Sequence, residues 1–302
     1  MTTLRLDERV QCVIRSEVNQ RPRNEDSFQA LVIPGQGGRG PLYLLMIADG
    51  MGGHAHGEDV SREGLRKMST CLLEELLVAP SINPVGCFPP HTSHEVQSAI
   101  QLAICQANLY LHAMMKKNHW GVAGATLVLA LIGCDRAWVA NLGDSPLFHW
   151  HSSTGELTQV TEDHTVTHAL LRSGQISPAM ADHHAYKNVL ELYLGCDRLP
   201  DPLPFYERHL REGDRLLLCS DGVSGGLSLA TLQSILSRPL PLEALAEDLI
   251  QASLAAESTD NQTLILWQHP APTPDLASSA LTTVLEFSQT PLSRNTLVQP
   301  RW

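Results

Sequence analysis

Carboxylates recur at the ends of apolar segments in this sequence of 302 residues. Asp49 follows the apolar run 44–48 and precedes a turn that contains Gly50, Gly52 and Gly53. Glycine permits backbone conformations that other side chains forbid, so this turn can bring the Asp49 carboxylate and the Gly50 carbonyl together at a strand end. Hard cations prefer such oxygen ligands. Because Asp-Gly is also a common turn, the other carboxylates must decide between a turn and a metal ligand.

The same arrangement recurs along the chain. Apolar residues lead into turns that carry Asp144, Asp221 and Asp260, and a comparable N-terminal turn carries Arg21, Glu25 and Asp26. Each of these carboxylates alone is more typical of a turn than of a ligand. Gathered at one rim of a sheet they would repel one another without bound cations, so together they predict an all-oxygen site for Mg²⁺ or Mn²⁺.

Short strands and amphipathic helices must position these carboxylates. Apolar residues recur every three or four positions in 54–78 and 96–114, which predicts two successive helices that cover a sheet. We expect strands in 10–33, 44–48, 125–132, 137–142, 146–151, 215–219 and 263–267, and further helices in 166–173, 227–237 and 242–256. The tight turns within 125–151 predict an antiparallel meander.

Composition narrows the class of protein and its location. The formal net charge of −11 argues against a nucleic-acid binder or an anionic-membrane binder. The seven cysteines are scattered without a CxxC pair, and no signal peptide or membrane span is apparent, so we expect a cytoplasmic protein. Beyond Gln268, a proline-rich stretch and a Ser/Thr-rich sequence predict a loosely held tail at 269–302.

Seven short motifs carry a resemblance to a known family. They are 21–26 (RPRNED), 48–54 (ADGMGGH), 124–126 (GAT), 143–145 (GDS), 163–164 (DH), 220–222 (SDG) and 259–263 (TDNQT). In this order they resemble the motif series of metal-dependent protein phosphatases of type 2C, and the second motif is typical of the bacterial branch. The resemblance implies an α+β fold, a four-layer α/β/β/α sandwich of two antiparallel sheets with a two-metal site at one edge. It also implies a catalytic domain at 1–268, with a flap at about 165–195, ahead of the tail at 269–302.

The resemblance also assigns roles to residues. Asp49 would bridge two Mn²⁺ or Mg²⁺ ions, and the Gly50 carbonyl would bind one of them. Asp221 and Asp260 would hold the first metal, Glu25 and Asp26 would support the centre through waters, and Asp144 with Asp221 would form a weaker third-metal site. Arg21 would clamp the phosphate. Pro146 stands where the family usually has an arginine, which removes a cation near the third-metal region, and Ser16 and Val18 replace a usual Asp and Gly.

The implied function is a protein serine/threonine phosphatase. A hydroxide that bridges the two cations would attack phosphoserine or phosphothreonine directly, without a phosphoenzyme. His54 is a candidate proton donor to the leaving oxygen, although a structural residue at the helix start and a bound water are the alternatives. The implied partners are phosphorylated proteins and a cognate bacterial Ser/Thr kinase, with a monomer expected. Two other functions stay open: a silent phosphoprotein-binding domain and a two-metal phosphomonoesterase for small molecules or nucleotides.

Overall fold

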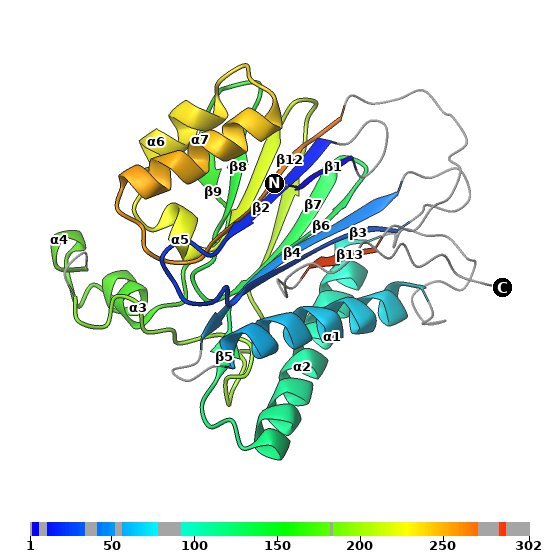
Figure 1. Cartoon of the computed structure of the whole chain (residues 1–302). Coiled ribbons are helices and arrows are strands. Elements are labelled where there is room, and N and C mark those ends of the chain that lie inside the picture. Colours follow the sequence, from blue (N-terminus) through cyan, green and yellow to red (C-terminus); the bar gives the residue numbers. More distant parts are fainter. Residues whose placement is uncertain are drawn as a thin grey trace.

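Two antiparallel sheets face each other, and helices cover the outer face of each sheet (Figure 1). The computed structural model describes residues 2–5, 11–33, 41–51, 56–77, 92–181, 184–270 and 284–287. This arrangement is the predicted four-layer α/β/β/α sandwich.

Sheet A, as we name it, contains six strands among the described residues. In spatial order they are β1 (Thr2–Arg5), β2 (Gln11–Glu17), β12 (Gln262–Gln268), β11 (Arg215–Cys219), β8 (Leu147–Trp150) and β9 (Leu157–Gln159). Two helices, α6 (Leu229–Leu236) and α7 (Leu242–Ala255), cover its outer face, and a single residue separates the short α5 (Asp221–Ser224) from β11.

Sheet B is the second layer. Its strands in spatial order are β10 (Phe205–His209), β7 (Arg136–Leu142), β6 (Leu127–Gly133), β4 (Leu42–Met51), β3 (Asp26–Ile33) and β13 (Val284–Phe287), and the short β5 (Gly124–Ala125) pairs with β4. The long helices α1 (Gly57–Leu77) and α2 (Ser93–Asn118) cover its outer face. The predicted flap contains α3 (Val166–Arg172) and α4 (Pro178–Ala181), which extend to the side of the sandwich in Figure 1.

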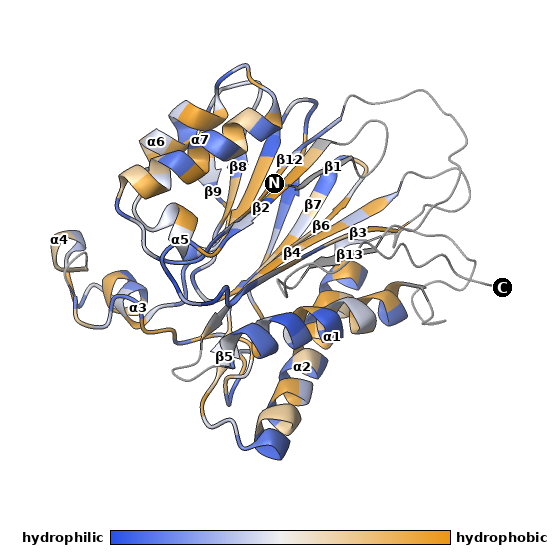
Figure 2. Cartoon of the chain, in the orientation of Figure 1, coloured by the Kyte–Doolittle hydropathy of each residue, from blue (hydrophilic) through white to orange (hydrophobic). Residues whose placement is uncertain are grey.

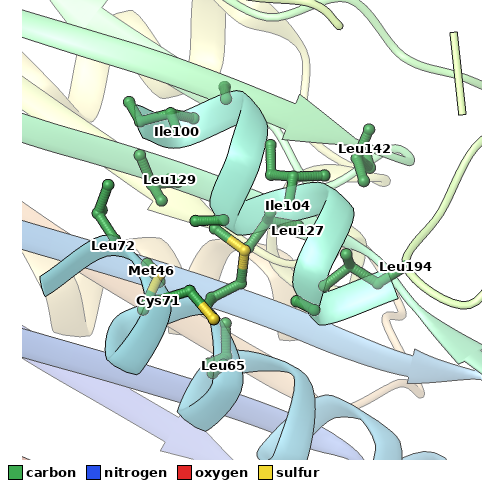
Figure 3. Packing of buried hydrophobic residues seen from close by; sticks show 14 of the residues in the cluster. Met46, Leu65, Cys71, Leu72, Ile100, Ile104, Leu127, Leu129, Leu142 and Leu194 are labelled. Carbon is green, nitrogen blue, oxygen red and sulfur yellow. The ribbon is translucent and has the colours of Figure 1, made fainter. Parts of the chain in front are cut away.

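Side chains of β4 alternate between two hydrophobic cores. Met46 packs with Leu65 and Ile104 in the core between sheet B and the two long helices (Figure 3). Leu45 and Ile47 point the other way, into the core between the sheets. Because both faces of β4 are buried, the strand appears in the sequence as a continuous apolar run. Figure 2 shows that the central strands of the sandwich are mostly hydrophobic. Each large side chain buried in this way contributes roughly 1.5–3 kcal/mol.

One predicted connection is wrong. β6 and β7 pair as expected, but β8 leaves the meander and pairs with β11 and β9 in sheet A. The chain crosses between the sheets at Gly143, whose φ of 98° lies in the left-handed region that glycine tolerates. The turn that carries Asp144 is therefore placed where the two sheets meet.

Part of the predicted tail joins the sandwich. Val284–Phe287 pairs antiparallel with β3 and forms an edge of sheet B. The boundary at residue 268 itself stays a prediction. No described helix is both long enough and apolar enough to cross a membrane.

Candidate metal centre

Both sheets deliver carboxylates to the same edge of the sandwich. Asp26 and Asp49 face each other in register on β3 and β4 of sheet B. Asp221 lies two residues after the end of β11 and Asp260 lies two residues before β12, so both come from sheet A. A cavity of about 640 Å³ opens here, lined by Arg21, Glu25, Asp49, Gly50, Met51, Thr126, Asp144, Asn188, Asp221, Asp260 and Asn261, among others. The sequence-predicted carboxylates thus converge.

Asp26 lies buried beneath this cavity. The Ser220 hydroxyl donates to Asp26 Oδ2 at 2.8 Å, whereas Asp26 Oδ1 has no hydrogen-bond partner. Burial raises the pKa of Asp26 to about 7, and the nearby charges of Asp221 and Asp260 add to the shift. A buried carboxylate of this kind needs either a proton or a compensating cation.

Asp49 and Asp221 are also buried carboxylates whose pKa values are raised. Burial is the largest cause that raises the pKa of Asp49 well above its ordinary value, followed by the charges of Asp26 and Asp221. Burial also raises the pKa of Asp221, followed by the charge of Asp260, and Asp221 Oδ1 is buried without a hydrogen-bond partner. The unpaired oxygens and the mutual repulsion fit a centre that divalent cations neutralise.

Gly50 is required by a close approach of three chain segments. A Cβ atom at this position would lie 2.2 Å from the Gly57 carbonyl oxygen and 2.7 Å from that of Glu25. The Gly50 amide donates to the Glu25 carbonyl at 3.1 Å. The N-terminus of α1, the Glu25 loop and the end of β4 can therefore meet only around a glycine, as the Asp-Gly turn suggested.

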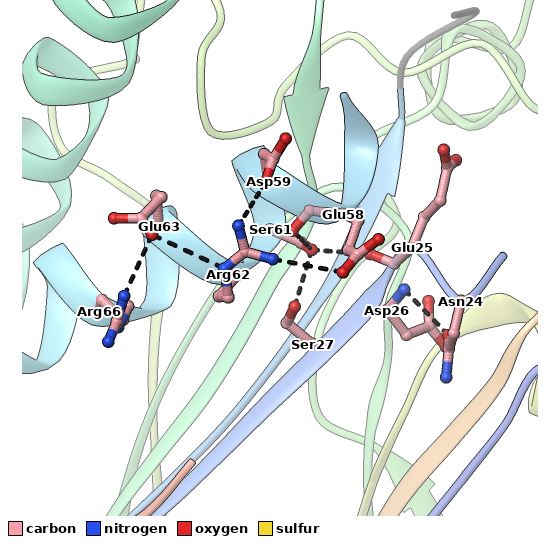
Figure 4. Close-up of polar contacts among 10 residues, drawn as sticks. All are labelled: Asn24, Glu25, Asp26, Ser27, Glu58, Asp59, Ser61, Arg62, Glu63 and Arg66. Atoms are coloured by element: carbon pink, nitrogen blue, oxygen red, sulfur yellow. Dashed lines mark hydrogen bonds and ion pairs between the residues drawn. The ribbon is translucent and has the colours of Figure 1, made fainter. Parts of the chain in front are cut away.

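The loop that carries Glu25 and Asp26 is held against α1 (Figure 4). The Ser61 hydroxyl on α1 is 2.7 Å from the Glu25 carbonyl and 2.8 Å from the Ser27 hydroxyl. The amide of Asp26 donates to the Asn24 side chain at 3.1 Å. These contacts fix the backbone on both sides of the two acidic residues.

Arg21 forms an ion pair with a predicted metal ligand. Its Nη2 lies 2.7 Å from Asp260 Oδ2, and both side chains are partly exposed at the cavity. The hydrogen bond to Asp260 and then its charge raise the pKa of Arg21, so the guanidinium stays charged. The two residues with predicted roles at the phosphate and at the metal thus lie in direct contact.

Asn261 is a positioning residue that the sequence reasoning did not assign. Its buried amide accepts from the Glu25 amide at 2.8 Å and donates to the carbonyls of Val18 and Arg23, each at 2.9 Å. It therefore ties the Arg21–Glu25 loop to the start of β12. The only sequence signal was its place in the motif at 259–263.

The region predicted to hold a third metal contains an additional carboxylate. Burial raises the pKa of Asp144 to about 7, and the charges of Asp221 and Asp163 contribute further. Asp163 Oδ1 accepts a hydrogen bond from the side-chain amide of Gln159 at 2.8 Å. Asp163 also lines a neighbouring cavity of about 410 Å³ with Asp144 and Asp221. Asp163 had no predicted role, although it belongs to a quoted motif.

Thr126 connects two of the predicted ligand segments. Its hydroxyl accepts from the Asp49 amide at 2.9 Å and lies 2.6 Å from the Ser145 hydroxyl. The end of β4 is thereby linked to the turn that carries Asp144. The predicted proton donor, His54, lies outside the described residues.

Known proteins are similar to this chain in sequence and in fold. A family model described as Protein phosphatase 2C matches residues 15–262. The serine/threonine phosphatase stp of Listeria innocua is 30% identical over 227 residues, which are 74% of this chain and 83% of that protein.

Solved structures agree with the fold. The serine/threonine phosphatase of S. agalactiae superposes with a TM-score of 0.73 at 22% identity, covering 86% of this chain and 99% of that one. The catalytic domain of the phosphatase PstP, solved in complex with two manganese ions, gives a TM-score of 0.65 at 27% identity and covers 86% and 98% of the two chains.

Proposed function

Because this chain belongs to the protein phosphatase 2C family, we propose that it hydrolyses phosphoserine and phosphothreonine in proteins with two Mn²⁺ or Mg²⁺ ions in its acidic centre. One observation carries the proposal. Aspartates from both sheets converge on one cavity, where burial and then the charges of neighbouring aspartates raise the pKa values of Asp49 and Asp221.

The residues present suit two hard cations. Asp49, the Gly50 carbonyl, Asp221 and Asp260 would hold the ions, while Glu25 and Asp26 would support them through bound waters. When bound, the cations supply an activated water and positive charge for the phosphoryl oxygens. Asp144, with Asp221 and the unpredicted Asp163, would provide a third and weaker position.

Arg21 would have two alternative partners. Its guanidinium now pairs with Asp260, and its planar fork also matches phosphoryl oxygens. A substrate phosphate in the cavity would therefore compete with Asp260 for Arg21. The exchange keeps the guanidinium paired in both states and places the phosphate beside the carboxylates that hold the cations.

His54 remains the candidate proton donor to the leaving serine or threonine oxygen, with a bound water as the alternative. We further propose that the protein is a monomer that opposes a bacterial Ser/Thr kinase in the cytoplasm. The six cysteines in the part of the chain that the structure describes are all free thiols, which supports a reducing compartment. The net charge of −11 supports the expectation that it binds neither nucleic acid nor anionic membranes.

The test compares phosphopeptide, aryl phosphate and nucleotide hydrolysis in Mn²⁺ and then in chelator. We expect phosphopeptide turnover that requires the metal and that falls by about a hundredfold or more in Asp221→Asn. Asp135→Asn is the matched control, because Asp135 lies exposed away from the cavity and should behave as the wild type.

Three results would contradict the proposal. Absent turnover would favour the silent binding domain, whereas turnover that persists in chelator would exclude a metal-dependent enzyme. Turnover of nucleotides alone would identify a small-molecule phosphomonoesterase.

A further inference from the structure

A group of potential ligand side chains lies at the other end of sheet A, away from the acidic centre. His149 is on β8, His151 follows that strand, and Asp214 immediately precedes β11. Asp221 follows the opposite end of β11, so an extended chain of this length separates Asp214 from the acidic centre by roughly 20 Å. These residues have no place in the proposed phosphatase reaction.

Strand geometry brings the three side chains to one face. Residues two apart on a strand point to the same side, so His149 and His151 share a face, and their ring centroids are 3.9 Å apart. His149 pairs with Leu216 across the β8–β11 ladder, which places Asp214 opposite His151. Leu147 and Leu216 belong to the core between the sheets, so the cluster faces the interior of the sandwich.

The cluster has the spacing of a metal site. Each of the three residues offers one ligand atom, and these atoms lie within 4.8 Å of one another. Among His, Cys, Asp and Glu side chains of the described residues, no other group of three does so. The carboxylates of the acidic centre are more widely spaced, as suits ions that keep several water ligands.

The Asp214 carboxylate is fixed before any metal binds. Its Oδ1 accepts from the Ser152 amide at 2.8 Å and from the Ser152 hydroxyl at 2.9 Å. Its Oδ2 accepts from the Arg211 amide at 2.9 Å and lies 2.9 Å from His149 Nε2. Such supporting hydrogen bonds orient the ligands in metal sites.

The environment of His149 favours metal binding. Its side chain is 0% exposed, and the ring nitrogen that faces Asp214 is Nε2. Burial lowers the pKa of His149, which favours the neutral imidazole that binds metals. His269, whose backbone amide donates to the Asp214 carbonyl at 2.8 Å, has a buried Nδ1 without a partner, so a third nitrogen donor lies next to the cluster.

We propose that His149, His151 and Asp214 form a second metal site, selective for Zn²⁺, that cross-links β8 and β11. Two imidazoles and one carboxylate are a donor set of zinc sites, whereas Mg²⁺ prefers oxygen ligands. The chain would then hold two chemically distinct centres, an oxygen-rich one for catalysis and a nitrogen-rich one that stabilises the opposite end of sheet A.

The test measures Zn²⁺ binding to the full chain by equilibrium dialysis in excess Mg²⁺, which competes for the acidic centre. His151→Gln is the main variant because His151 is only half-buried, and His94→Gln is the matched control at an exposed position on α2. We expect the wild type and the control to bind one more Zn²⁺ per chain than His151→Gln, or to bind it about tenfold or more tightly. Zn²⁺ should also raise the melting temperature of the wild type and of His94→Gln, but not that of His151→Gln.

Replacement of Zn²⁺ by Co²⁺ gives a spectroscopic check. A site with imidazole ligands and low coordination number should give visible absorption bands in the wild type and the control that are lost in His151→Gln. Phosphatase activity with Mn²⁺ should be the same in all three proteins. Equal Zn²⁺ binding by His151→Gln and the wild type, or no Zn²⁺ bound by the wild type at micromolar concentration, would overturn the proposal.

Discussion

Replacement of Asn261 by alanine should lower both the stability of the protein and its phosphatase activity, although Asn261 is not a predicted metal ligand. The buried side chain makes three hydrogen bonds, one from the Glu25 amide and two to the carbonyls of Val18 and Arg23. A net contribution of about 1 kcal/mol for each gives a loss of about 3 kcal/mol in the free energy of unfolding. The same change releases the loop that positions Arg21, and a displacement of about 1 Å at a reacting group can lower kcat/KM by about a hundredfold.

Asn108→Ala separates the two effects. Asn108 is also a buried asparagine, and its side chain donates to the Cys196 carbonyl at 3.0 Å and accepts from the Gly195 amide at 2.6 Å. Neither Asn108 nor these two partners line the active-site cavity. We therefore expect a loss of about 2 kcal/mol in stability with an unchanged kcat/KM.

Urea unfolding and phosphopeptide kinetics in Mn²⁺ test both variants under the same conditions. Asn261→Ala should lose both stability and kcat/KM, whereas Asn108→Ala should lose stability alone. Equal kcat/KM values for the two variants would show that Asn261 acts only on stability, and the reasoning about the loop would then be refuted.

Three other predictions concern the carboxylates and their neighbours. Arg21→Ala should raise KM for phosphopeptide more than it lowers kcat, because the phosphate clamp is lost; an unchanged KM in steady-state kinetics would remove Arg21 from that role. Gly50→Ala should abolish activity and lower the melting temperature, because the added Cβ would lie 2.2 Å from a carbonyl oxygen. Gly64→Ala on α1 is the control and should be tolerated, because its Cβ would lie 3.4 Å from the nearest atom. In chelator, stability should fall as pH rises from 4 to about 7, because Asp144 with its pKa of about 7 keeps a proton that the unfolded chain releases near 3.8. Thermal unfolding of Asp144→Asn should show a smaller pH dependence than that of the wild type, and an identical dependence would contradict this assignment.

Much of the site could be predicted because turns leave a local signature. Asp49 and Gly50 are adjacent in the sequence, and the close approach at Gly50 needs the one residue type that the sequence supplies. The central strands were also predictable, since the alternation of β4 between two cores produces a continuous apolar run, whereas the short strands β1, β9, β10 and β13 were not predicted.

Long-range contacts explain what the sequence did not predict. The turn at 143–145 looks like a hairpin, but β8 pairs with β11, a strand that begins only after the intervening residues 151–214. Asn261 contacts the distant segment that carries Glu25, and Asp163 lies near Asp221 only in the folded chain, so their places in local motifs did not reveal these roles. The His149–Asp214 cluster likewise forms only when β8 and β11 pair.

The division of the acidic centre between the two sheets has a mechanical consequence. Asp26 and Asp49 move with sheet B, whereas Asp221 and Asp260 move with sheet A. Any sliding of one sheet over the other would therefore change the distances between ligands, even if no residue of the site were altered. Substitutions such as Ile47→Val or Ile265→Val lie in the core between the sheets and should therefore weaken cation affinity. Ile→Val substitutions beneath the outer helices should weaken it less, because they do not change how the two sheets lie against each other. Cation affinity would thus report how accurately the two halves of the sandwich are aligned.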